Sequence, residues 1–213
     1  AYLEDGFTSE VKSFSGYQLK SGVYNMYINR EPRFYASIGF SGCFWPCAST
    51  SEAVKKNVYV YYWKGASGYG ASGKDKAVGS GDANNYPVTG YVMKKYVHND
   101  DAWSGTDATV LPKSFPIIRY AEILLGYAET LNELGDSKNA VKTVNLIRKR
   151  AGVGELDENK NWNKDELRQR IYKEYRVEFA FEDNRFFDAR RWAKAEEWFS
   201  KPVYKVTVTG SLE

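Results

Sequence analysis

Apolar side chains recur every three or four residues through most of the second half of the chain. This spacing places them on one face of a helix, so it predicts a helix over about residues 116–134. The apolar positions of this helix are Ile117, Ala121, Leu124, Leu125, Ala128, Leu131 and Leu134. Gly135 is expected to end the helix in the left-handed conformation, and Asp136 is expected to cap a second helix that runs to about Arg150.

Two more helices are predicted towards the C-terminus. Asn163 can cap a helix that starts near Lys164, and a short fourth helix follows over about residues 185–199. The apolar positions of the third helix are Leu167, Ile171, Tyr175, Phe179 and Phe181, and those of the fourth include Phe186, Trp192 and Trp198. We expect the two tryptophans of the fourth helix to lie in the core.

The first two helices resemble the tight hairpin of a tetratricopeptide repeat. Residues 118–150 give a helix, a short turn and a helix, and the small residues Ala128 and Ala140 fall where such helices pack closely. Stacked repeats bury their apolar faces against neighbouring repeats. We expect the helices of residues 164–199 to be the neighbour of this hairpin.

The first half of the chain has a different pattern, with short β-compatible runs between glycine-rich and polar loops. The runs are residues 34–40, 57–63 and 89–98, and residues 203–209 near the C-terminus are similar. Residues 1–30 are expected to be irregular, with a helical turn at about residues 24–28. Twenty of the 34 aromatic rings and 13 of the 18 glycines lie in residues 1–114. The pattern divides the chain into a loop-rich region (1–114), a helical scaffold (115–200) and a truncated C-terminal segment (201–213).

Charge and composition exclude several classes of protein. The 213 residues have a net charge of +3, with acidic and basic residues interspersed, which is not the basic stripe of a nucleic-acid-binding protein. No apolar run approaches the roughly 20 residues of a membrane-spanning helix. No nucleophile elbow, phosphate loop, dinucleotide fingerprint or HExxH pattern occurs. The opening AYLEDGFTSE is typical of the middle of a domain, and the final Leu-Glu is a candidate vector remnant, so we expect a fragment of a longer protein.

The cysteines and the candidate metal ligands leave alternatives open. Cys43 and Cys47 match neither a thioredoxin motif nor a zinc motif, and either a disulfide or two buried thiols fits their spacing. His98 is the only histidine, and we expect it on the solvated surface beside residues 99–101 rather than bound to a metal. The oxygen-rich loops at 82–85 and 99–101 are candidate Ca²⁺ sites, although neither has an EF-hand pattern. No other cofactor is expected.

A block of alternating carboxylates and guanidiniums lies near the end of the helical region. Its members are Glu174, Glu178, Glu182, Arg185, Asp188, Arg190 and Arg191. Four-residue spacing favours ion pairs along and between helices over a pair of catalytic carboxylates. Arg119 and Glu122 are expected to tie helices together in the same way. A glycoside hydrolase that uses carboxylates such as Asp82, Asp100 or Asp101 is the enzymatic alternative.

Four segments, in this order, resemble the SusD/RagB family. They are EPRFYASIGFSG (31–42), TGYVMKKY (89–96), IRYAEILLGYAETLNELG with VNLIRKRAG (118–152), and YRVEFAFEDNRFFDARRW (175–192). The resemblance covers the C-terminal part of the family fold. The lipobox-bearing N-terminus and the closing proline-rich tail of the family are absent from this sequence.

This resemblance implies a mainly α, SusD-like fold and a binding protein rather than an enzyme. It implies capture of an oligosaccharide at the outer-membrane surface of Bacteroidetes by a lipoprotein whose anchor lies outside this chain. The ligand would pass to a TonB-dependent transporter of the SusC/RagA type. A peptide-binding, RagB-like uptake protein is the alternative within the family.

Aromatic rings on loops of the first half are the candidate ligand contacts. The apolar faces of sugar rings stack on aromatic side chains, which offer a large contact area. The candidates are Phe44, Trp45, Trp63, Tyr69, Tyr86 and Trp103. Trp45 and Trp103 lead, since each lies among glycine, serine, proline or polar residues. Core packing is the alternative role for any one of these rings.

Overall fold

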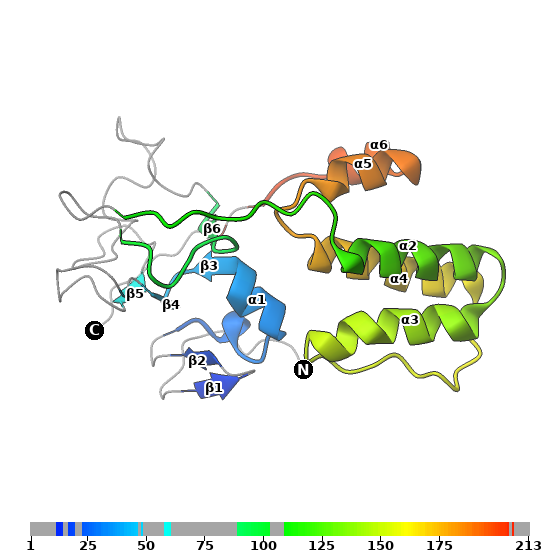
Figure 1. Ribbon diagram of the computed structural model, residues 1–213, viewed down its shortest axis with the longest axis horizontal. Helices are drawn as coiled ribbons and strands as arrows, with labels where there is room; N and C mark the ends of the chain where they lie inside the picture. The colour runs from blue at the N-terminus through cyan, green and yellow to red at the C-terminus, as the bar shows by residue number, and fades with distance from the viewer. Residues whose placement is uncertain are drawn as a thin grey trace. The chain divides into compact units, whose positions relative to one another are not determined.

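The computed structural model describes residues 12–14, 17–19, 23–46, 48, 58–60, 89–102, 109–204 and 206. The chain divides into two compact units (Figure 1). Each unit has its own buried apolar cluster. Unit 1 comprises Ala1–Arg30, Phe34–Lys113 and Val203–Glu213, and unit 2 comprises Glu31–Arg33 and Ser114–Pro202. Among the described residues, the long helices belong to unit 2 and the strands to unit 1.

Unit 2 is built around an antiparallel helical hairpin. Its helices are α2 (Tyr120–Glu133), α3 (Ser137–Arg150), α4 (Lys164–Glu178), α5 (Asn184–Arg191) and α6 (Ala195–Phe199). Figure 1 shows α2 and α3 joined by a tight turn, with α4 packed alongside both. The helical hairpin and the neighbouring helix that the sequence predicted for this part of the chain are therefore confirmed.

Local sequence explains where the hairpin turns. Gly135 has a φ of +88°, and the amide of Asp136 donates to the carbonyl of Leu131, as in a Schellman motif. The Asp136 side chain accepts a hydrogen bond from the amide of Asn139 at 3.2 Å and so caps α3. Asn163 caps α4 through the amide of Asp165 at 2.9 Å. The predicted capping roles of Gly135, Asp136 and Asn163 are all confirmed.

The core of unit 2 lies between α2, α3 and α4. Its buried members are Ala121, Leu125, Ala128, Ala140, Val141, Val144, Ile147, Leu167, Ile171, Tyr175 and Phe179. These residues recur at helical spacing on all three helices, which is the pattern that the sequence predicted. Trp192 packs against the same cluster and is partly buried.

Several residues that were expected on the buried apolar faces of these helices are exposed, and one predicted helix is divided in two. Helix α2 begins at Tyr120, so Ile117 precedes it and is 90% exposed, while Leu134 at the helix C-cap is 79% exposed. Helix α4 ends at Glu178, and Phe181 lies beyond it in the left-handed region with half of its side chain exposed. The expected helix at 185–199 is two helices, because Ala193 has a φ of +53° and interrupts the backbone.

Replacement of Ala128 by leucine is expected to lower the free energy of unfolding by about 1–3 kcal/mol. The Ala128 side chain is completely buried in the cluster between the helices, so added methyl groups must displace their neighbours. The measurement is urea denaturation followed by circular dichroism at 222 nm. The control is Ala195→Leu at the start of the short helix α6, outside this cluster, where a change below about 0.5 kcal/mol is expected. Equal stability of Ala128→Leu and the parent protein would contradict close packing at this position.

Unit 1 contains three two-stranded antiparallel sheets within its described residues. Its elements are β1 (Lys12–Phe14), β2 (Tyr17–Leu19), η1 (Asn25–Tyr27), β3 (Ile38–Phe40), β4 (Cys43–Trp45), β5 (Val58–Val60) and β6 (Tyr91–Met93). The short helix α1 (Pro32–Ser37) belongs to unit 1 from Phe34 onwards, while Pro32 and Arg33 belong to unit 2. The pairs are β1 with β2, β3 with β6, and β4 with β5. Gly42 turns β3 into β4 with a φ of +87°, and a Cβ atom at this position would meet Val23 at 2.8 Å.

Two sequence-based assignments in unit 1 need correction. Residues 34–40 were expected to form one strand, but α1 continues to Ser37 and only Ile38–Phe40 is extended. Pro32 is the first residue of α1, a position that its fixed φ favours, and this start overrides the local β propensity. Residues 1–30 were expected to be irregular apart from one turn, yet they contribute β1 and β2, while the turn itself is confirmed as η1.

Aromatic rings dominate the core of unit 1. Its buried members are Leu19, Val23, Tyr27, Tyr35, Phe40 and Cys43. The ring centroids of Tyr27 and Phe40 are 4.3 Å apart, and the Tyr35 hydroxyl donates to the carbonyl of Tyr27 at 2.6 Å. Cys43 carries a free thiol, and burial raises its pKa to about 11. Cys47 lies outside the described residues.

Residues 203–209 were expected to form a strand. Of residues 203–209, those that the structure describes (203, 204 and 206) do not form a strand, although the amide of Val206 donates to the carbonyl of Thr89 at 3.0 Å. Within the described ranges, none of the helices combines the length and the apolar character needed to cross a membrane.

Candidate functional site

The strand pair β4–β5 holds the candidate ligand contacts that the structure describes. Phe44 lies directly opposite Tyr59, and their ring centroids are 5.6 Å apart in an edge-to-face arrangement. Side chains alternate between the two faces of a strand, so Phe44 points away from the face that holds Cys43 and Trp45. Cys43 is buried in the core of unit 1, whereas Phe44 and Tyr59 are both partly exposed. The two rings therefore form a partly exposed aromatic pair on the face opposite to the core.

A lysine side chain is hydrogen-bonded to the backbone of strand β4. The Nζ atom of Lys94 donates a hydrogen bond to the carbonyl of Phe44 at 3.1 Å. Burial lowers the pKa of Lys94, an effect that the nearby Cys43 partly opposes. The backbone amide of Lys94 donates to the carbonyl of Ser37 at 2.9 Å, so the backbone of this lysine is held to the end of α1 as well. Lys94 thus fixes the backbone that carries Phe44.

The remaining sequence-based candidates divide into two groups. Trp45 is partly buried and packs against the core of unit 1. Trp63, Tyr69, Tyr86 and Trp103 lie outside the described residues. Tyr59 was missed, although it lies in the predicted strand 57–63, because no local pattern shows which residue of a distant strand will face Phe44.

The carboxylates next to His98 are held by their own neighbours. Asp101 accepts hydrogen bonds from Lys113 Nζ at 2.5 and 2.6 Å and from the amides of His98 and Leu111 at 2.9 and 3.0 Å. Burial alone would raise the pKa of Asp101, but these hydrogen bonds, led by that of Lys113, outweigh it and lower the pKa to about 2. A carboxyl group with so low a pKa is a poor proton donor near neutral pH. Asp101 is therefore unsuited to the general-acid role of a glycosidase, and Asp82 lies outside the described residues.

The loop at 99–101 was also expected to be a candidate Ca²⁺ site. Within the described ranges, no three His, Cys, Asp or Glu side chains come together in a way that would hold a metal ion. His98 is half exposed, and its Nδ1 accepts a hydrogen bond from the amide of Asp100 at 3.1 Å. The candidate Ca²⁺ loop at 82–85 lies outside the described residues.

The acidic–arginine block forms an ion-pair cluster inside unit 2. Glu178 accepts from Arg33, Arg119 and Arg150 at 3.1, 2.9 and 2.5 Å. Glu174 accepts from Arg33 at 2.7 Å, and its other oxygen accepts from Arg148 at 2.8 Å. The expected structural role of this block is confirmed for Glu174 and Glu178, which are both buried.

Two arginines that bind this cluster come from distant parts of the sequence. Arg119 also binds Glu182 in a bidentate manner, at 2.7 and 2.8 Å, which confirms its expected role in tying helices together. Arg33, from the Glu31-Pro-Arg segment, had not been assigned a role from the sequence. Its guanidinium bridges Glu174 and Glu178, so this family-like segment is pinned to α4.

The C-terminal part of the block behaves differently from the expectation. Asp188 pairs with Arg191 at 2.8 Å, and Arg191 also binds Glu129 of α2 through two bonds of 2.8 Å. Arg185 and Arg190, in contrast, form no ion pair with any residue that the structure describes; each lies over an aromatic ring instead. The prediction of carboxylate partners is wrong for these two arginines.

The described residues thus combine a helical hairpin with short strand pairs, one of which carries partly exposed rings. The model of the SusD family matches residues 1–211, and the chain therefore belongs to the SusD family. SusD-like protein P2 of Formosa agariphila is 41% identical over 88 residues, which are 38% of this chain and 17% of that protein.

Solved structures of SusD-like proteins have the same fold. A SusD-like protein from Bacteroides fragilis superimposes with a TM-score of 0.62 and 35% identity, over 81% of this chain and 30% of that one. A SusD-like carbohydrate binding protein from the same species superimposes with a TM-score of 0.58 and 23% identity, over 89% of this chain and 35% of that one. The chain thus spans about a third of the length of these solved relatives.

Proposed function

We propose that this protein binds an oligosaccharide at the outer-membrane surface, without chemical conversion, and delivers it to a TonB-dependent transporter of the SusC type. The observation that carries the proposal is the match to the SusD family along nearly the whole chain. One protein of the same fold is described as a SusD-like carbohydrate binding protein, which makes glycans the first ligands to test.

The aromatic pair on β4–β5 supplies a physical means of binding. A sugar ring buries its apolar C–H face on an aromatic ring, and the partly exposed Phe44 and Tyr59 offer such rings at fixed positions. The cross-strand pairing and the bond from Lys94 hold the backbone of Phe44 in place before any ligand arrives. A preformed surface loses less entropy on binding than a flexible one. Trp45, Trp63, Tyr69, Tyr86 and Trp103 remain proposed ligand contacts, although Trp45 lies on the opposite face of β4 from Phe44.

Removal of either ring of the pair is expected to weaken glycan binding without unfolding the protein. Phe44→Ala and Tyr59→Ala should each raise Kd about tenfold, which corresponds to about 1.4 kcal/mol. The measurement is isothermal titration calorimetry with the best ligand from a panel of neutral and acidic oligosaccharides. The matched control is Tyr120→Ala, which removes a well-exposed ring from α2 and should leave Kd unchanged.

Two outcomes would contradict the proposal. New reducing ends released from the glycan panel would indicate a hydrolase, and tight binding of peptides with no glycan binding would indicate a RagB-like role. For the transporter, we expect the protein to co-purify from outer membranes of its source cells with a TonB-dependent channel. Recovery of the protein only in the soluble fraction would contradict the proposed location.

A further inference from the structure

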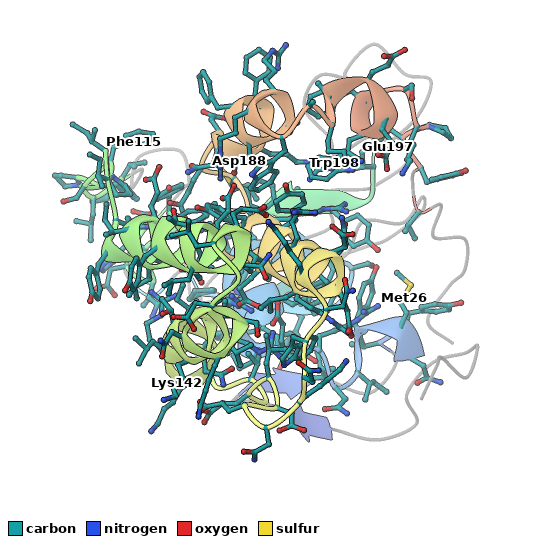
Figure 2. The ribbon with its side chains drawn as sticks, turned by 90° about the vertical axis from the view of Figure 1, so that its right-hand side faces the viewer. Met26, Phe115, Lys142, Asp188, Glu197 and Trp198 are labelled. Atoms are coloured by element: carbon teal, nitrogen blue, oxygen red, sulfur yellow. The ribbon has the colours of Figure 1, made fainter. Side chains whose placement is uncertain are left out.

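A hollow of about 320 Å³ lies between α4, α5 and α6 of unit 2. Aromatic rings make up most of its lining, and its charged members are Arg176, Asp183, Arg185 and Asp188. Figure 2 shows Asp188 and Trp198 on the side of α5 and α6 that faces α4. The volume is near the lower end of the roughly 300–1,000 Å³ typical of small-molecule sites, which suits a single ring and its substituents.

An arginine is held in place on the wall of this hollow. The guanidinium carbon of Arg185 lies 4.6 Å from the centre of the Trp198 ring. Trp198 is in turn packed edge-on against Trp192 at 5.9 Å and Tyr172 at 6.1 Å. Stacking occupies the face of a guanidinium and leaves the N–H groups in its plane available, in the fork that matches a carboxylate. The ring beneath Arg185 therefore orients the donors before any ligand arrives.

Two arginines and two aspartates line the hollow, and one of the aspartates is already paired with an arginine outside it. Neither Arg185 nor Arg176, which also lines the hollow, forms an ion pair with a described residue. Of the two lining carboxylates, Asp188 already binds Arg191 at 2.8 Å, and Asp183 lies exposed at the start of α5. Burial and then the neighbouring Arg176 lower the pKa of Arg185, and Asp188 partly opposes this shift. A bound anion would relieve this repulsion between the two arginines.

We propose that the hollow between α4, α5 and α6 binds a uronic acid unit of an oligosaccharide, with Arg185 and Arg176 holding its carboxylate. This inference rests on the proposed function only for the ligand class, and the site is distinct from the aromatic pair on β4–β5. The half-exposed rings of Phe181, Phe186 and Phe199 supply apolar surface for the C–H face of the sugar. The Asp183 carboxylate can accept hydrogen bonds from sugar hydroxyl groups. A peptide that ends in phenylalanine also carries a ring and a carboxylate, but its side chain has no hydroxyl group to donate to Asp183.

The experiment measures binding of trigalacturonic acid to the 213-residue protein by calorimetry. The comparison ligands are its methyl ester, neutral galactotriose, and a short peptide that ends in phenylalanine with a free carboxylate. We expect the acid to bind at least tenfold more tightly than the ester or the neutral sugar. Arg185→Gln should weaken binding of the acid at least tenfold, and Arg176→Gln about threefold. Arg170→Gln is the matched control, since this exposed arginine on α4 does not line the hollow.

The outcomes separate this inference from the proposed function. Phe44→Ala should retain the Arg185-dependent binding of trigalacturonic acid. If Phe44→Ala abolishes that binding while Arg185→Gln retains it, the inference is overturned and the proposed function stands. Equal binding of the acid and its ester, equal loss in Arg170→Gln, or a preference for the peptide would each overturn it. If Arg185→Gln does not fold, as judged by circular dichroism, Arg176→Gln carries the test, because its side chain is exposed.

Discussion

Replacement of Glu178 by glutamine is expected to lower the free energy of unfolding by about 3–5 kcal/mol. The Glu178 side chain is only 3% exposed and accepts hydrogen bonds from Arg33, Arg119 and Arg150. The neutral amide keeps the shape of the side chain but leaves these guanidiniums with less negative charge. A loss of this size is a large fraction of the roughly 5–15 kcal/mol that stabilises a typical domain. Urea denaturation followed at 222 nm measures it.

A matched control exists on the same helix. Glu166 of α4 pairs with Lys160, but both side chains are about 40% exposed, so Glu166→Gln should cost less than about 1 kcal/mol. If Glu178→Gln and Glu166→Gln cost the same, the buried cluster does not stabilise unit 2.

The same glutamate should make stability depend on pH. Burial would raise the pKa of Glu178, but the hydrogen bonds from Arg150 and Arg119 outweigh burial and hold the pKa below its usual value. With a lower pKa in the folded state, the contribution to stability is complete above the unfolded pKa of about 4.3 and is lost as the pH falls through the folded pKa. Denaturation at a series of pH values should therefore show a shallower acid dependence in Glu178→Gln than in the parent protein. Parallel curves would contradict this assignment.

Replacement of Phe40 by alanine is expected to destabilise unit 1 by about 3–5 kcal/mol. Phe40 is completely buried, and its ring lies 4.3 Å from Tyr27 and 5.3 Å from Phe34, measured between centroids. Loss of the ring opens a cavity among aromatic side chains that are themselves fixed by the strands and by η1. Differential scanning calorimetry, with near-ultraviolet circular dichroism to follow the aromatic environment, measures the effect.

Phe44→Ala is the natural comparison, because Phe44 lies on the neighbouring strand β4 but is partly exposed. We expect it to cost much less than Phe40→Ala in stability while weakening glycan binding. If the two variants are equally unstable, Phe44 belongs to the core and the proposed binding surface loses its central residue.

The helical half was largely predictable because its signals are local. Apolar spacing of three and four residues marks the buried faces of α2, α3 and α4, and the caps at Asp136 and Asn163 mark helix starts. The errors fall at the ends. Ile117 and Leu134 continue the apolar spacing beyond the hydrogen-bonded helix, and Ala193 adopts a positive φ that no pattern of apolar residues reveals.

The candidate site was only partly predictable. Phe44 and Trp45 were both identified as rings next to a turn, but the sequence could not show that they point to opposite faces of one strand. That difference depends on the pairing of β4 with β5, which brings together residues 15 positions apart, such as Phe44 and Tyr59. The roles of Trp63, Tyr69, Tyr86 and Trp103 remain predictions.

The sequence by itself determined the helices of unit 2, their caps and the small residues of the hairpin, because each depends on residues within one or two turns of one another. It also carried the SusD/RagB resemblance, through four segments in a fixed order along the chain. Only the tertiary structure decided the partners of the charged groups. Arg33 reaches Glu174 and Glu178 across more than 140 positions, while Arg185 stacks on Trp198 instead of pairing with a carboxylate. Ion pairs and ring stacking act over a few ångströms in space, so their partners are fixed by how the helices pack and not by their order along the chain.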